Sequence, residues 1–123
     1  MSYAERHTVA MTTAADGSAT AYSPVITGKL SQIRYVKTDF TDGVDFTITA
    51  EATGETLWAE LNVNASATRA PRQATHDTAG VAALYAAGGA AVNDKIALAK
   101  DRVKIVLAAG GNAKTGVFHI IIE

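Results

Sequence analysis

Residues 44–51 have the sequence VDFTITAE, and this stretch decides the fold class. Its apolar side chains alternate with polar ones, which places the two kinds on opposite faces of an extended chain. After Thr53-Gly54 the alternation resumes, with Trp58 among the polar positions. The two stretches therefore predict a pair of half-buried strands joined by a tight turn. The side chains expected to face the core from the second strand are Leu57, Ala59, Leu61 and Val63.

Further strands are expected on both sides of this pair. Asp16-Gly17 and Asp42-Gly43 favour hairpin turns, so the first half is predicted to be a meander of four or five antiparallel strands. Residues 93–109 fit two strands with a break at Lys100-Asp101 better than one helix, because a helix would scatter their apolar side chains around its circumference. Residues 110–116 are expected to form a hairpin loop between the last two strands.

The segment at positions 117–122 is apolar on both of its faces, around His119. A strand of this kind is either central in a sandwich or covered by another subunit. Residues 64–80 are polar, contain Pro71 and show no period, which predicts a long loop, and residues 81–87 fit one helical turn or a short strand. The predicted fold is one all-β domain over residues 1–123. It is an antiparallel two-sheet β-sandwich of jelly-roll or Greek-key type, with one long crossover loop and an N-terminal arm over residues 1–7.

Composition excludes several classes of protein. The chain has 123 residues, 48% of them hydrophobic and 19% charged, which is a globular profile and excludes wholesale disorder. It has no cysteine, so disulfides and thiolate metal sites are excluded. The net charge of −1 shows no basic excess, and no apolar run has the length of a bilayer, so neither nucleic acid nor membrane is an expected partner. No signal peptide is evident, and synthesis in the cytoplasm is expected.

The sequence contains no clear pattern for catalysis or for binding a metal or phosphate. None of its three histidines has metal-ligand spacing, and His76-Asp77 would need a special turn to act as an acid–base pair. The loop at 110–116 differs from a phosphate-binding loop because Ala113, not glycine, precedes Lys114. The acids at 39, 42 and 45 lack the spacing of a calcium loop and are interpreted as turn residues. No catalytic residue, metal or cofactor is predicted, and the protein is not expected to be an enzyme.

Contact with another protein is the more promising hypothesis. Arg69 and Arg72 flank Pro71 and form a small basic patch on the long loop, which is either solvated or a contact surface. Trp58 is a carbohydrate-stacking platform, a buried aromatic or an interface anchor. The N-terminal arm is a second expected contact. The candidate protein-contact residues are Tyr3, Arg6, Trp58, Arg69, Arg72 and His76.

Several segments carry a resemblance to a known group of proteins. They are residues 35–49, 70–77, 84–89, 101–106 and 110–122, within a region of roughly residues 28–122. These segments resemble small virion proteins of tailed bacteriophages, and most closely the jelly-roll cement, or decoration, proteins of short-tailed phages. The resemblance implies a structural protein on the outer surface of the capsid that bridges neighbouring major capsid protein subunits. It also implies a homo-oligomer, with a dimer favoured over a trimer, and no catalytic residues.

Two other functions stay open at this point. A carbohydrate- or receptor-binding sandwich of a phage tail or fibre would use Trp58 and tyrosines as stacking surfaces, and an exposed Trp58 would favour it. A small hydrolase or isomerase would need a cleft that brings His76 beside a carboxylate.

Overall fold

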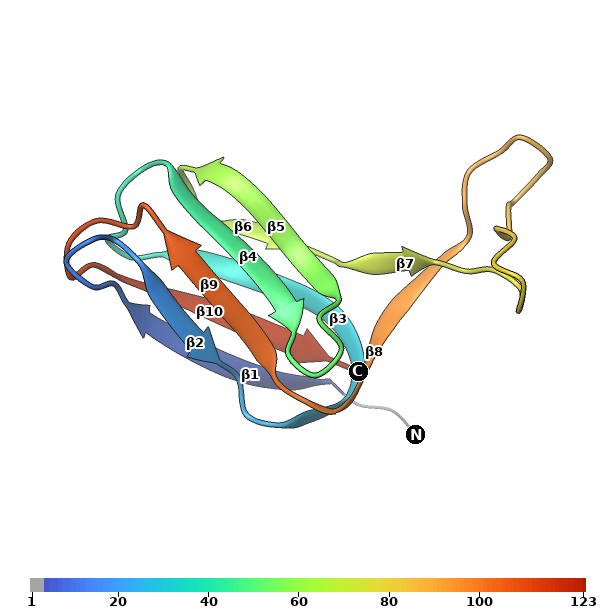
Figure 1. The fold of residues 1–123 in the computed structure, drawn as a ribbon, viewed down its shortest axis with the longest axis horizontal. Coiled ribbons are helices and arrows are strands. Elements are labelled where there is room, and N and C mark those ends of the chain that lie inside the picture. The colour runs from blue at the N-terminus through green and yellow to red at the C-terminus, as the bar shows by residue number, and fades with distance from the viewer. Residues whose placement is uncertain (1–3) are drawn as a thin grey trace.

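Two antiparallel β-sheets pack face to face in the computed structural model, which describes residues 4–123 (Figure 1). These residues contain no helix, and so none that could cross a membrane. Within this range the ten strands are β1 (Glu5–Thr12), β2 (Ala19–Tyr22), β3 (Ile26–Lys37), β4 (Val44–Ala50), β5 (Thr56–Val63), β6 (Ala67–Arg69), β7 (Arg72–Ala74), β8 (Asn93–Asp101), β9 (Val103–Ala108) and β10 (Thr115–Ile122). The predicted all-β sandwich is confirmed.

The order of the strands identifies the topology. One sheet has six strands in the order β1-β10-β3-β8-β7, with β6 also pairing with β3, and the other has the order β2-β9-β4-β5. The chain changes sheet between β1 and β2, β2 and β3, β3 and β4, β5 and β6, β8 and β9, and β9 and β10. This double wrapping, in which the first strand pairs with the last, is a jelly roll.

The predicted meander is wrong. Asp16-Gly17 and Asp42-Gly43 do form tight turns, and the two glycines have φ angles of 84° and 87°. Each turn, however, carries the chain to the opposite sheet instead of to a paired neighbour, and so does the loop at 110–116. Turn residues specify a change of direction, whereas burial decides which sheet the next strand joins. After β3, for example, Phe40 is buried in the core and its ring lies against Gly116.

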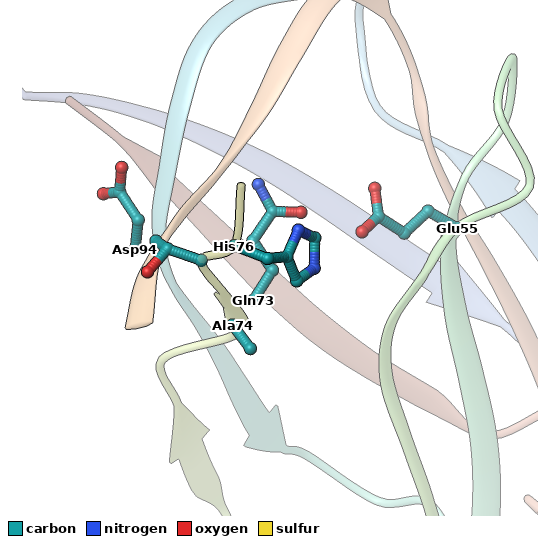
Figure 2. Close-up of a pocket in the computed structure, with 6 residues that line it drawn as sticks. Glu55, Gln73, Ala74, His76 and Asp94 are labelled. Atoms are coloured by element: carbon teal, nitrogen blue, oxygen red, sulfur yellow. The ribbon is translucent and has the colours of Figure 1, made fainter. Parts of the chain in front are cut away.

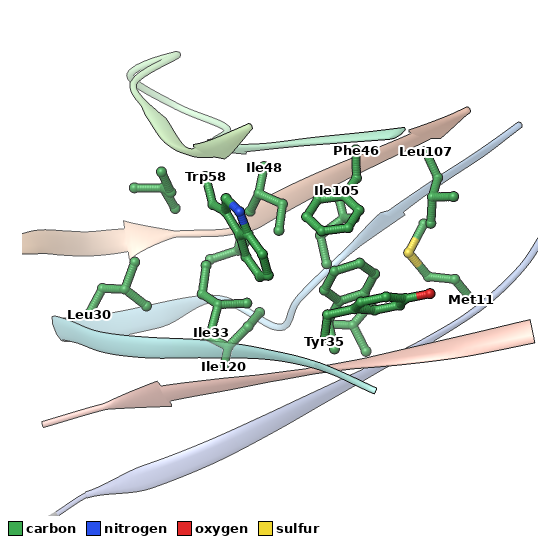
Figure 3. Close-up of a cluster of buried hydrophobic side chains, with 14 of the residues drawn as sticks. Met11, Leu30, Ile33, Tyr35, Phe46, Ile48, Trp58, Ile105, Leu107 and Ile120 are labelled. Carbon is green, nitrogen blue, oxygen red and sulfur yellow. The ribbon is translucent and has the colours of Figure 1, made fainter. Parts of the chain in front are cut away.

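Side chains from both sheets fill the space between the layers (Figure 3). The alternation in β4 is confirmed, because Val44, Phe46, Ile48 and Ala50 are all at most 2% exposed. An aromatic group forms the centre: the ring of Phe46 lies 4.7 Å from Trp58 and 5.2 Å from Phe118, both edge to face. Residues 93–109 form two strands, as predicted, although the break falls at Arg102.

The predicted faces of β5 are correct only in part. Leu57 and Val63 are buried as expected, but Trp58 is buried as well, whereas Ala59 is exposed and Leu61 is 76% exposed. The pairing of β4 with β5 shifts register twice, between Val44 and Phe46 and between Ile48 and Thr49. A bulge of this kind moves the following side chains to the other face, so a simple alternation cannot continue along the strand.

Strand β10 lies inside its sheet, which is the first of the two expectations for residues 117–122, a central strand or one covered by another subunit. It pairs with β1 over residues Glu5 to Thr12 and with β3 on its other side. Phe118 and Ile120 face the core, and the outward side chains are half-buried. The expected N-terminal arm over residues 1–7 is wrong for residues 5–7, which belong to β1 and pair with β10, whereas Tyr3 lies outside the described residues.

Candidate functional site

The connection between β5 and β8 forms an arm that projects from the sandwich (Figure 1). We define the arm as residues 72–93. Its stem is the pairing of β7 with β8, in which Arg72 lies opposite Lys95 and Ala74 opposite Asn93. The prediction of an unstructured loop over residues 64–80 is wrong in this respect, because the segment contains β6 and β7. Residues 81–87 form no helical turn and take part in two isolated bridges instead.

Backbone hydrogen bonds order the arm beyond its stem. The amide of Thr75 donates to Val92 O (2.8 Å), that of Ala83 donates to Thr75 O (2.9 Å), and that of Val92 donates to Ala83 O (3.0 Å). Residue 83 is thereby held between the outgoing and returning chains. The carboxylate of Asp77 accepts from the amides of Ala79 (2.9 Å) and Val81 (3.0 Å), which closes a turn. The arm therefore has a defined shape.

Almost none of the arm is buried. Residues 76–90 are all exposed, and residues 78–93 include no charged side chain. Val81, Leu84 and Tyr85 are 64%, 43% and 76% exposed, and we call these three side chains the arm tip. The chain exposes 6841 Å² in total, compared with roughly 6,300 Å² expected for a compact protein of its mass. An ordered, uncharged and exposed segment of this kind is typical of a surface that another molecule covers.

Arg72 fastens the base of the arm to the sandwich. Its Nη1 atom donates to the carbonyl oxygens of Ser31 in β3 (3.0 Å) and of Pro71 (2.8 Å). The predicted contact residue thus has a structural role, although it is exposed. His76 lies on the arm, and its backbone bridges to Ala82.

Trp58 in β5 and Arg69 in β6 lie together, in the part of the chain that precedes the arm. The Arg69 guanidinium makes two hydrogen bonds of 3.1 Å to the Glu60 carboxylate and lies 5.5 Å from the centre of the Trp58 ring. The indole Nε1 of Trp58 donates to the same carboxylate (3.0 Å). Trp58 is only 6% exposed, so its placement on the polar face is wrong and its ring is not a stacking platform.

One hollow of about 530 Å³ lies at the base of the arm, and Glu55, His76 and Asp94 line it together with residues 73–75. Figure 2 shows the His76 ring between the two carboxylates. This is the combination of groups that an acid–base site would need, but no hydrogen bond joins the three side chains, all of which are exposed. The Thr75 hydroxyl in its wall already donates to Val92 O (2.8 Å). The hollow therefore lacks an oriented acid–base pair.

The acids at positions 39, 42 and 45 each have their own partner. Asp39 accepts hydrogen bonds from the amide and hydroxyl of Thr115, which lower the pKa of its carboxyl group. Asp42 pairs with Lys37, and Asp45 accepts from the amide of Asn62 (2.8 Å). Their interpretation as turn residues fits these contacts. Within residues 4–123 no group of three or more histidines and acids could hold a metal ion.

Sequence reasoning missed the arm tip. The available signal was the run of uncharged residues at 78–93, in which alanine and glycine predominate and no apolar period indicates a core partner. No protein-family model and no curated protein matches the chain.

Proposed function

We propose that this chain is a structural virion protein that decorates and cements a phage capsid by bridging neighbouring major capsid protein subunits on the outer surface of the shell. The observation that supports this most is the arm, which is ordered by backbone hydrogen bonds yet leaves Val81, Leu84 and Tyr85 exposed. Each square ångström of apolar surface that a partner covers stabilises the complex by about 25 cal/mol. An arm that buries its tip on a neighbouring subunit uses this energy for binding.

The shape of the chain also suits a bridge. The sandwich is one contact body, and the arm extends away from it on a stem held by β8 and by Arg72 (Figure 1). A protein with two separated contact regions can bind two subunits at once. Because a shell repeats the same contact many times, and a homo-oligomer such as a dimer links several arms, a modest affinity per arm is sufficient.

Carbohydrate binding through Trp58 receives no support from the side chain's burial. The jelly roll itself does not choose between these functions, because unrelated proteins, lectins and capsid proteins among them, share it.

The proposal is tested by measuring how the chain binds purified capsids of the phage whose genome encodes it. The double variant Leu84→Ser/Tyr85→Ser removes two of the three apolar side chains of the arm tip without touching the core. Its control is Leu61→Ser, because Leu61 is as exposed as Tyr85 but lies on β5, in the other sheet.

We expect wild type and the control to decorate the capsids and to raise their resistance to heat, and we expect the double variant to lose at least about tenfold in affinity. Failure of the wild-type chain to bind capsids would overturn the proposal. Equal binding of the double variant and the wild type would mean that the arm does not contact the capsid.

A further inference from the structure

The outer surface of the six-stranded sheet carries two arginines on neighbouring rows. The register of β10 with its neighbours places Thr8, His119 and Arg34 in one row, and Arg6 beside Ile121 in the next. Residues that alternate with buried ones along a strand face away from the core. Val9, Phe118 and Tyr35 are the buried neighbours here, so the row points outward. We call Arg6, Thr8, Arg34, Val117, His119 and Ile121 the cationic face.

The positive charge of this face is not neutralised within the described chain. Neither Arg6 nor Arg34 forms an ion pair among residues 4–123, and Arg34 donates only to the Thr68 hydroxyl (3.0 Å). Elsewhere Lys37, Lys95, Arg69 and Arg102 each pair with a carboxylate.

Carboxylates that flank β1 and β10 already have partners. Glu5, which precedes Arg6 in β1, lies 3.4 Å from His7 Nε2. Asp39 and Glu123 lie at the two ends of β10, where they accept hydrogen bonds from Thr115 and Lys95. The net charge of −1 therefore conceals a strand surface with unpaired arginines.

The neighbours of the arginines indicate what kind of molecule fits. Val117 and Ile121 face outward from β10 on the two sides of the His119–Arg34 row and are half-buried, with Ile121 directly beside Arg6. Arginine beside aliphatic groups is typical of a protein interface, where the guanidinium pairs with a carboxylate over an apolar floor. A nucleic-acid surface would carry a larger basic excess.

A second copy of this chain does not fit the cationic face. In a two-fold dimer the same patch meets itself, which would bring the arginines of both copies together without an intervening acid. Like charges facing each other across an interface oppose association. The complementary surface therefore belongs to a different protein.

We infer that the cationic face docks an acidic surface of another protein, whose carboxylates pair with Arg6 and Arg34 and whose aliphatic groups cover Val117 and Ile121. This contact uses β1, β3 and β10 and does not involve the arm. It stands even if the arm binds something other than a capsid.

The inference is tested by titrating the isotope-labelled chain with a peptide of alternating Glu and Ala and following backbone amide shifts by NMR. A DNA duplex of equal charge is titrated in parallel. The variant is Arg34→Glu, with Arg6→Gln as a second, milder change. The control is Lys104→Glu, which makes the same reversal on β9, between buried Val103 and Ile105, on the outer surface of the other sheet.

We expect the peptide to shift the amide signals of β1, β3 and β10. Arg34→Glu should weaken the affinity for the peptide about tenfold, and Lys104→Glu should change this affinity by less than about twofold. Thermal unfolding verifies that each variant is folded. Equal weakening by the two reversals, shifts on another surface, or no binding at low salt would overturn the inference. Tighter binding of the DNA to the same strands would overturn it as well, since the face would then be a nucleic-acid surface.

Discussion

The hydroxyl of Tyr35 is buried in the core and has no hydrogen-bond partner among residues 4–123. The centre of its ring lies 5.1 Å from that of Phe118 and 5.4 Å from that of Phe46. The ring therefore stabilises the core, whereas the hydroxyl oxygen does not. A buried polar group without a partner costs about 1–3 kcal/mol. We therefore predict that Tyr35→Phe raises the free energy of unfolding by about 1 kcal/mol, as measured by urea denaturation.

The matched control for this change is Tyr85→Phe, because Tyr85 is 76% exposed and should have no effect on stability. A loss of stability in Tyr35→Phe would mean that the hydroxyl has a bonding role in the core.

The same residue should determine how stability changes at alkaline pH. Burial, together with the charge of Asp42, raises the pKa of Tyr35 from 10.0 to about 12. Between these values the folded chain keeps a proton that the unfolded chain has released, so stability falls as the pH rises through this window. Tyr35→Phe should remove this part of the decline, and equal slopes for the two proteins above pH 10 would contradict the assignment.

At the scale of elements, the passage from β8 to β9 shows how the chain changes sheet. Asp101 ends β8 and is 5% exposed, and its carboxylate accepts hydrogen bonds from the amides of Ala52 (2.9 Å) and Arg102 (2.8 Å). Lys100 beside it has a φ of 49°. The carboxylate thus satisfies amides at a corner where neither sheet supplies partners, and it ties the β4–β5 turn to the crossing.

We predict that Asp101→Ala lowers the free energy of unfolding by about 2–3 kcal/mol, because the amides of Ala52 and Arg102 lose a buried, charged acceptor. Urea denaturation measures the effect. The comparison is Asp94→Ala, since Asp94 is exposed on β8 at the base of the arm and should change stability by less than about 0.5 kcal/mol. Equal effects of the two substitutions would contradict a special role for the corner.

At the scale of the whole molecule, the sandwich closes by pairing its first strand with its last. Glu5 lies opposite Ile122, so residues 4 and 123 can be joined by a short linker, while the arm contributes little to the core. We predict that a circular permutant opened between Gly88 and Gly89 folds cooperatively, with a stability within about 1 kcal/mol of the parent. Circular dichroism and urea denaturation measure this.

The control for the permutant is opened between Asp101 and Arg102, at the buried corner, and should not fold. If the chain opened in the arm fails to fold while the corner permutant folds, the arm would have to be part of the folding core.

The sequence by itself determined the local geometry of this protein. Alternation at Val44, Phe46 and Ile48 specified a half-buried strand, because a side-chain period of two has only one structural solution. The doubly apolar stretch at 117–122 left two possibilities, a central strand or one covered by another subunit, and only the pairing of β10 with both β1 and β3 decided for the first. The uncharged run at 78–93 was equally visible, although its meaning was not.

Tertiary structure alone decided which strands pair, which face of β5 is inside and what surrounds the candidate contact residues. Turn residues such as Asp42-Gly43 reverse the chain equally well within a sheet and between sheets, so only burial of residues far apart in sequence selects the jelly roll. The bulges in β5, which bury Trp58, likewise depend on the burial of residues that are far apart in sequence. The exposed arm and the unpaired arginines of the cationic face come from packing too, because a side chain's partners depend on what the rest of the fold brings beside it.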